Sequence, residues 1–219
     1  KQFYIDERKS NKGIRLTNDL RKLVSEMNGI DLLPEIESRW RLVETAWDLN
    51  ISRNLIAVSH DEETQSLYVG DNLRRKNITS SRDALNGYQK GKCFFCFDRI
   101  SVNPKSEFLA HVDHFFPHVL KDTDLGQKVD GIWNLVLACQ TCNGSGEKGA
   151  KVPHLTLVER LDRRNEYLLE SNHPLKETIL GQTGMRREQR ISFIQDAYEV
   201  AIRRLVSTWQ PIIKGSPAF

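Results

Sequence analysis

The sequence predicts an α+β fold that is mostly α, with helical segments at both ends of the chain and a short β-containing unit between them. Three observations support this prediction. Apolar residues recur at helical spacing near both ends, two runs typical of strands lie in the middle, and two Cys-x-x-Cys pairs enclose those runs. We expect a mainly helical region over residues 1–90, a central unit over residues 91–152 and a helical region over residues 153–219.

The N-terminal part is expected to hold two helices, a small β-hairpin and a short third helix. The first helix stops at Asn28-Gly29, and its apolar stripe consists of Leu20, Leu23, Val24 and Met27. The second begins near Pro34, and its expected core face consists of Ile36, Trp40, Val43 and Trp47. Apolar runs at 56–58 and 67–69, joined by a polar loop over 60–65, predict the hairpin.

The C-terminal part is expected to hold two longer helices. Thr156 and Glu159 have the spacing of a capping box at the start of one of them. The last helix runs over about 185–209, and its expected buried stripe consists of Ile191, Ile194, Tyr198, Ala201 or Ile202, Leu205 and Trp209. On its exposed side Glu199 and Arg203 are four residues apart, which favours an ion pair.

Composition excludes some classes of protein. The chain has 32 basic and 29 acidic residues and is 39% hydrophobic, which is typical of a globular protein rather than a disordered one. No apolar run approaches the roughly 18 residues that cross a bilayer, and the first residues do not resemble a signal peptide, so we expect a cytoplasmic protein without membrane contact. Basic pairs such as Arg163-Arg164 fit phosphate contacts, but a solvated helix face explains each pair better.

The four cysteines have the spacing of a zinc site. Cys93 and Cys96 form one Cys-x-x-Cys pair, and Cys139 and Cys142 form the other. Two such pairs complete the tetrahedral sulfur shell that zinc prefers, so we expect one structural Zn²⁺ per chain. Redox pairs would need a βαβ context, and disulfides would need an oxidising compartment; the sequence indicates neither.

The segment between the cysteine pairs predicts two strands. Residues 108–118 alternate enough for a strand that ends at Pro117, and residues 132–138 form a second strand after the Asp130-Gly131 turn. A polar stretch over 143–148 follows the second pair and is expected to open a short helix.

Taken together, these residues resemble the zinc-stapled HNH endonucleases, over about residues 93–151. The matching features, in chain order, are the first cysteine pair, Asp113-His114 with Pro117, Asn134-Leu135, and the second cysteine pair with Asn143. The helix around Arg39-Trp40 and the approach over 88–93 are similar to bacterial restriction-type members. The resemblance implies a ββα-metal HNH core, stapled by the four-cysteine zinc site and flanked by N- and C-terminal helical segments.

The resemblance also implies catalytic roles. The residue matching His114 is the general base, and those matching Asp113 and Asn143 hold a catalytic Mg²⁺ or Mn²⁺. The residue matching Asn134 pins the loop between the strands, and a backbone carbonyl near it orients the base. Each has a structural alternative: Asp113 as a loop cap, Asn134 as a purely structural group, and Asn143 as a helix cap.

Three more residues are candidate substrate contacts. His111 shares a strand face with Asp113, and His118 lies four residues beyond His114; for both histidines a supporting role is the alternative. Many family members have a His where this chain has Asn143, and a Lys three residues later, where this chain has Gly146. Lys148 comes two residues after that, so it is expected to contact phosphate.

The expected activity is hydrolysis of DNA to 5′-phosphate and 3′-hydroxyl ends, in restriction or anti-phage defence by family analogy. Two alternatives stay open. One is a nuclease subunit activated by a partner, such as an ATPase or a target-recognition protein, and the other is an idle zinc-stapled nucleic-acid-binding module. The resemblance leaves open a homodimer, nicking or double-strand cutting, and the recognition sequence.

Overall fold

The computed structural model describes residues 2–26, 32–48, 58–61, 63–69 and 76–217 and has a mixed α/β fold. Its α-helices are α1 (Arg8–Asn11), α2 (Asn18–Glu26), α3 (Leu32–Asp48), α4 (Ser81–Gln89), α5 (Leu155–Glu170), α6 (Lys176–Thr183) and α7 (Arg187–Arg204). Its strands are β1 (Tyr4–Glu7), β2 (Gly13–Leu16), β3 (Val58–Asp61), β4 (Ser66–Val69), β5 (Lys76–Ser80), β6 (His111–His114), β7 (Leu135–Ala138), β8 (Val152–Pro153) and β9 (Thr208–Trp209). Short 3₁₀ helices are η1 (His118–Asp122), η2 (Gly126–Asp130) and η3 (Ile132–Asn134).

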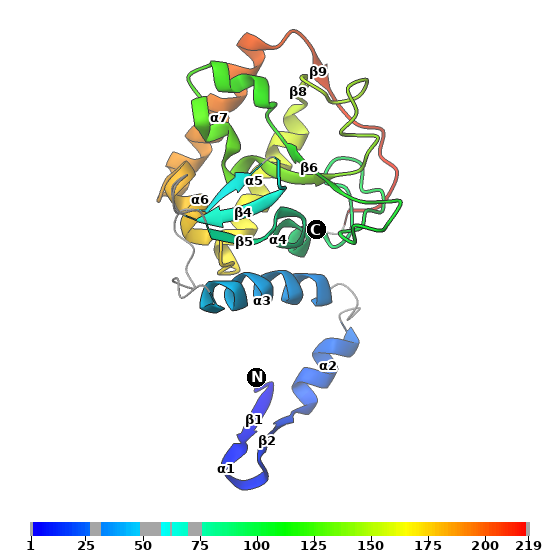
Figure 1. Cartoon of the computed structure of the whole chain (residues 1–219), viewed down its shortest axis with the longest axis vertical. Helices are drawn as coiled ribbons and strands as arrows, with labels where there is room; N and C mark the ends of the chain where they lie inside the picture. The colour runs from blue at the N-terminus through cyan, green and yellow to red at the C-terminus, as the bar shows by residue number, and fades with distance from the viewer. Residues whose placement is uncertain (1, 27–31, 49–57, 62, 70–75, 218–219) are drawn as a thin grey trace.

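The strands form four small sheets rather than one large one. The antiparallel pairs are β1-β2 and β6-β7, the sheet β3-β4-β5 has three strands, and β8 and β9 are parallel. In Figure 1 β6 lies within the body of the molecule, and β1, α1, β2 and α2 extend away from that body below α3. No helix in the described part of the chain has the length and apolar character needed to cross a membrane.

The core is built around the β6-β7 pair. All four residues of β7 are buried, and the largest fully buried aromatic side chains are Phe94, Phe95, Phe115, Phe116 and Trp133. Burial of each such ring contributes roughly 2–3 kcal/mol, so this cluster is a major source of stability. Phe94 and Phe95 lie between Cys93 and Cys96, and Phe115 and Phe116 directly follow β6, so these segments are part of the buried core.

The side chain of Gln89 extends the β6-β7 pair at its edge. Its Nε2 donates to the Leu137 carbonyl over 2.7 Å, and its Oε1 accepts from the Leu137 N–H over 2.7 Å. A buried strand edge needs partners for its backbone groups, and this buried amide supplies both. The last residue of α4 therefore fixes β7 just before the second cysteine pair.

The predicted core face of α3 is wrong for Ile36 and Trp40, and the side chain of Trp47 lies outside the described part of the structure. Ile36 and Trp40 are 58% and 53% exposed, whereas Ser38 and Leu42 are buried. The reason is the close approach of α4, where a Cβ on Gly87 would lie 2.9 Å from Ser38 Oγ. Ser38 Oγ donates to the Ala84 carbonyl over 2.9 Å, so a small polar residue faces the neighbouring helix.

Other predictions are partly correct. The hairpin is present as β3-β4, but His60 lies in a strand rather than in the loop, β5 adds a third strand, and 56–57 lie outside the described residues. The β1-β2 hairpin has no counterpart among the predicted elements. The last helix ends at Arg204, and Trp209 belongs to β9 instead. Its Glu199–Arg203 ion pair is present at 3.7 Å.

Two further predictions concern helix starts. His154, not Thr156, caps α5, because its side chain accepts from the Thr156 N–H. The short helix expected after the second cysteine pair is absent from the described residues: 143–151 form successive turns, and the next helix is α5.

The two strands predicted between the cysteine pairs are present as β6 and β7, with η3 in place of the first three residues of the second predicted strand.

Candidate active site beside a four-cysteine cluster

The two cysteine pairs converge on one buried point. Their four sulfur atoms all lie within 4.8 Å of one another, and Cys96 Sγ is 3.7 Å from Cys139 Sγ. A tetrahedral site with Zn–S bonds of about 2.3 Å separates its sulfurs by about 3.8 Å, so the cluster fits zinc. The cluster can therefore hold a metal ion such as zinc, and four protein ligands leave no open position for chemistry.

The hydrogen bonds of the cluster shift the pKa values of its thiols in opposite directions, lowering those of Cys96 and Cys139 and raising those of Cys93 and Cys142. Hydrogen bonds with Cys142 hold the pKa of Cys139 well below its ordinary value, and the same contact raises the pKa of Cys142. Thiolates are the form that binds zinc. The first pair is fixed to the strand pair, since the Phe94 N–H donates to the Leu137 carbonyl over 2.9 Å.

Strand β6 presents the two central residues of the predicted motif. In its antiparallel register Asp113 is opposite Val136, and His114 is opposite Leu135. Successive side chains of a strand point to opposite faces. The structure accordingly places Asp113 and His114, both buried, in two different groups of side chains.

His114 lies in a group with Asp130, Lys121 and His118. Its Nε2 donates to Asp130 Oδ1 over 3.1 Å, and Lys121 Nζ lies 2.5 Å from Asp130 Oδ2. His118 Nε2 is 3.9 Å from the same Oδ1, and its side chain is 46% exposed. The ring of His60 on β3 lies 6.2 Å from that of His114, centroid to centroid. A carboxylate side chain thus orients the candidate base.

Asn134 closes the loop between the strands by hydrogen bonds. Its Oδ1 accepts from the Phe116 N–H over 2.8 Å, and its Nδ2 donates to the carbonyls of Phe116 and Val129. Its own carbonyl accepts from the Phe115 N–H over 2.7 Å. The fully buried Asn134 therefore holds the chain directly after His114, in a supporting rather than a reacting position.

Arg164 of α5 also stabilises this loop by hydrogen bonds to its backbone carbonyls. Its guanidinium donates to the carbonyls of Ile132, Trp133 and Leu135, and burial lowers its pKa to about 10. The prediction that the Arg163-Arg164 pair lies on a solvated helix face is therefore wrong for Arg164. Backbone carbonyls of η3 and β7 need donors, and Arg164 supplies them.

Asp113 forms a buried ion pair with Lys148. Lys148 Nζ donates to Asp113 Oδ1 over 3.0 Å and to the His114 carbonyl over 2.7 Å. Burial raises the pKa of Asp113 and lowers that of Lys148, while each charge partly offsets the shift of the other. The predicted phosphate contact of Lys148 is therefore corrected: the turns over 143–151 send this side chain inward, where it is only 2% exposed.

Asn143 and His111 lie together on the Asp113 side of the strand pair. Asn143 Nδ2 is 3.1 Å from His111 Nδ1. Apart from the cysteines, no group of three His, Cys, Asp or Glu ligands occurs among the described residues. Any cation bound here would thus take few ligands from the protein.

Sequence patterns do not reveal three of the residues around His114, namely Asp130, Lys121 and His60. Asp130 is recognisable only as part of a turn, and Lys121 and His60 carry no signal of a role. Asp130 lies 16 residues from His114, and His60 comes from a separate hairpin, so neither contact has a local sequence pattern. Only the positions of η2 and β3 beside the end of β6 reveal them.

Comparison of the chain with protein-family models, curated proteins and solved structures gave no match. The functional argument therefore rests on the residues and their geometry.

Proposed function

We propose that this chain is a metal-dependent endonuclease of the HNH type that hydrolyses DNA phosphodiester bonds. One observation carries the proposal: His114 ends strand β6, whose partner strand β7 leads into the second cysteine pair, and its Nε2 is bound by the Asp130 carboxylate. A histidine held by a carboxylate is suited to remove a proton from water near neutral pH. The neighbouring Asp113 supplies a carboxylate one residue away.

The residues of the chain would divide the work. Held by Asp130, His114 would take the proton of the attacking water, and Asp130 would stabilise the resulting imidazolium. Lys121 would hold the Asp130 carboxylate from its other oxygen. Asn134 and Arg164 would keep the loop after His114 in place, so that the ring does not reorient during the reaction.

The Asp113 side fits a hard cation by its donor chemistry. Apart from its ion-pair contact with Lys148, the buried Asp113 Oδ2 makes no hydrogen bond among the described residues. The amide oxygen of Asn143 is a second oxygen donor nearby on this side. Mg²⁺ or Mn²⁺ is commonly held by one or two protein oxygens with water and phosphate as further ligands. When bound, it would neutralise charge on the phosphate and on the departing 3′ oxygen.

Cleavage of supercoiled plasmid tests the proposal. Purified protein with Mg²⁺ or Mn²⁺ is expected to nick or linearise the plasmid, and EDTA is expected to abolish cutting. His114→Ala should lower the rate by at least about a hundredfold, as loss of a general base does. His154→Asn is a matched control, since it changes an exposed histidine that caps α5 and retains a capping side chain. Equal cutting by His114→Ala would refute the role of His114.

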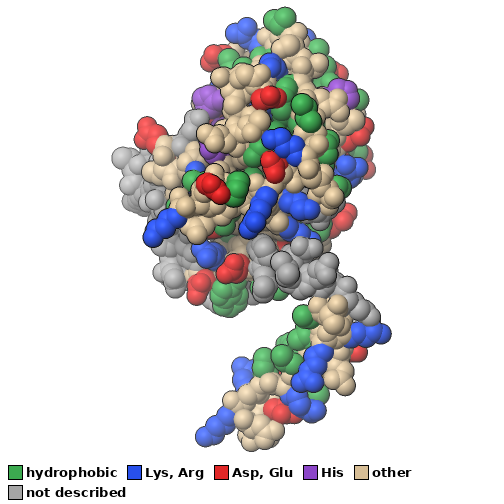
Figure 2. Space-filling view, turned by 90° about the vertical axis from the view of Figure 1, so that its right-hand side faces the viewer, with side chains coloured by type: hydrophobic (Ala, Val, Ile, Leu, Met, Phe, Trp, Pro, Cys, Tyr) green, Lys and Arg blue, Asp and Glu red, His purple; other side chains and the backbone are tan. Residues whose placement is uncertain are grey.

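The N-terminal extension favours a second candidate, a nuclease subunit activated by a partner protein. Figure 2 shows this extension apart from the body, with apolar and basic side chains on its surface. Its exposed apolar residues are Phe3, Tyr4, Ile14, Leu16 and Val24. Such a set is typical of an interaction surface. Little cutting by the pure protein, with a large gain when its partner is added, would select this candidate. A role in restriction or phage defence remains part of the proposal.

A further inference from the structure

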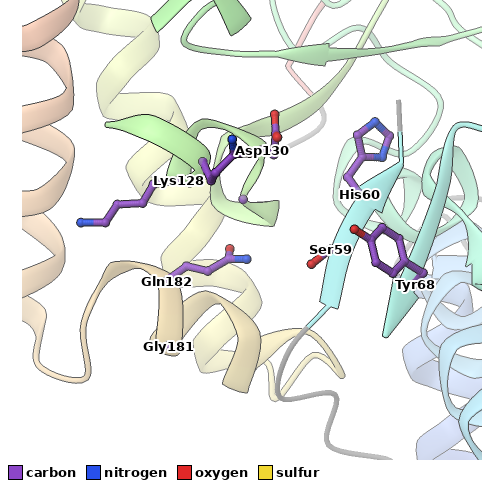
Figure 3. Close-up of a pocket in the computed structure, with 9 residues that line it drawn as sticks. Ser59, His60, Tyr68, Lys128, Asp130, Gly181 and Gln182 are labelled. Atoms are coloured by element: carbon purple, nitrogen blue, oxygen red, sulfur yellow. The ribbon is translucent and has the colours of Figure 1, made fainter. Parts of the chain in front are cut away.

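A pocket of about 430 Å³ lies beside the His114 group. It opens between the β3-β4 hairpin on one side and η2 and α6 on the other, and its polar lining includes Ser59, His60, Tyr68, Gln127, Asp130 and Gln182. Figure 3 shows Ser59 and Tyr68 on the hairpin, across the pocket from Gln182, with His60 above them. A volume of this size is in the range of small-ligand sites.

The pocket is continuous with the candidate active site. Asp130 lines the pocket and also accepts the hydrogen bond of His114 Nε2. His60, on the opposite wall, has its ring 6.2 Å from the His114 ring. A group bound in the pocket would therefore be a near neighbour of a phosphate that reacts at His114.

The lining suits a neutral, flat, polar ligand. Ser59, Tyr68, Gln127 and Gln182 offer hydroxyl and amide groups that donate and accept hydrogen bonds. The one lysine of the wall, Lys128, is directed away from the hairpin in Figure 3, with Nζ 5.8 Å from the Phe193 ring centroid. The pocket thus lacks the cations that a phosphate needs. Hydrogen-bonding groups beside the aromatic rings of His60 and Tyr68 match a nucleobase.

We infer that this pocket binds one unstacked nucleobase of the DNA strand that is cut, next to the phosphate at His114. The inference rests on the proposed nuclease function and specifies its substrate. A base enters such a pocket only after leaving its stack, which costs more free energy in a perfect duplex than in single-stranded or mismatched DNA. The enzyme therefore prefers single-stranded or locally unpaired DNA to a perfect duplex.

The test uses the full chain with His114→Ala, which binds DNA without cutting it. The probe is a single-stranded oligonucleotide with one 2-aminopurine, whose fluorescence changes when the base leaves its neighbours. Ser59→Tyr fills the pocket, because Ser59 is exposed on β3 and directed into the pocket, and tyrosine is favourable in a strand. Ser66→Tyr makes the same change on β4 outside the pocket wall.

The inference predicts a fluorescence change on binding that Ser66→Tyr retains, with affinity about tenfold weaker in Ser59→Tyr, the scale of one lost base contact. Binding without a fluorescence change, equal affinity in the two variants, or no binding would overturn it. Displacement of the oligonucleotide by free 2-aminopurine nucleotide at equal concentration would also overturn it, in favour of a free nucleotide as ligand. Cutting is measured separately. His114-dependent cleavage with no preference for unpaired DNA would overturn the role of the pocket in base binding but would support the proposed nuclease function.

Discussion

Lys148 Nζ lies 3.0 Å from Asp113 Oδ1, with both side chains buried, and it also binds the carbonyl of His114 over 2.7 Å. This one ammonium group connects the turns after the second cysteine pair to both central residues of the motif. A buried charge is tolerated only when it is paired and hydrogen-bonded, so the pair fixes where Asp113 can lie. The end of β6 is thus held by electrostatics on one side and by the Asn134 hydrogen bonds on the other.

Replacement of Lys148 by methionine should destabilise the protein strongly. Lys148→Met keeps most of the side-chain volume but leaves Asp113 as an unpaired buried carboxyl, which costs about 3 kcal/mol in the free energy of unfolding. Urea denaturation followed by circular dichroism measures this loss. Lys105→Met, at an exposed lysine, is the control and should change stability by less than about 0.5 kcal/mol. Equal stability of the two variants would show that the ion pair contributes little.

Replacement of Asp130 should slow catalysis without weakening substrate binding. Asp130→Asn removes the carboxylate that binds His114 Nε2, and loss of such a supporting group costs about 10- to 100-fold in activity. Steady-state cleavage of an oligonucleotide should show a lower kcat with KM within about twofold of wild type. Lys121→Met removes a further partner of Asp130 and should have a smaller effect. A rise in KM with unchanged kcat would place Asp130 in binding instead.

The features that are predicted correctly have local sequence patterns. The cysteine spacing is a property of two tetrapeptides, and the four thiols do converge. The two strands between them follow from alternation and from the turn at Asp130-Gly131. The hairpin at β3-β4 follows from two short apolar runs around a polar loop. Each pattern involves neighbours in the chain, so no knowledge of the packing is needed.

The features that escape prediction depend on packing between distant segments. The buried face of α3 is set by Gly87 of α4, which admits Ser38 and leaves Trp40 exposed. Lys148 points inward because of the path of the turns after Asn143, which spacing alone does not reveal. His60 reaches the His114 group from a separate sheet. The sequence therefore predicts the four-cysteine cluster and the strands beside it, but not the groups that position Asp113 and His114.

Removal of metal should unfold the central unit. The four buried sulfurs lie where zinc would join residues 93–96 to 139–142, and binding free energy at such a site contributes directly to folding. We expect one zinc per chain by mass spectrometry of the metal content. Stripping it, or Cys139→Ser, should lower the free energy of unfolding by on the order of 5 kcal/mol or more. A metal-free protein with unchanged thermal stability would contradict this expectation.

Acid should destabilise the fold partly through His173. This residue is buried, its Nδ1 accepts from the Leu175 N–H over 3.2 Å, and burial lowers its pKa to about 3. The unfolded chain binds a proton at this residue near pH 6.5, while the native chain does not until about pH 3. Stability is therefore present above about pH 6.5 and is lost as pH falls from about 6.5 towards 3, by up to about 1.4 kcal/mol per pH unit.

The variant His173→Asn isolates this contribution, since an asparagine amide oxygen can still accept from the Leu175 N–H. Urea denaturation of both proteins from about pH 7.5 to about pH 4.5 should give a free energy of unfolding that falls more steeply in wild type. By about pH 4.5 the difference between the two proteins should have changed by roughly 2–3 kcal/mol. The same replacement at exposed His154 should leave the wild-type slope unchanged. Parallel curves for wild type and His173→Asn would mean that His173 gains its proton in the folded protein as readily as in the unfolded chain.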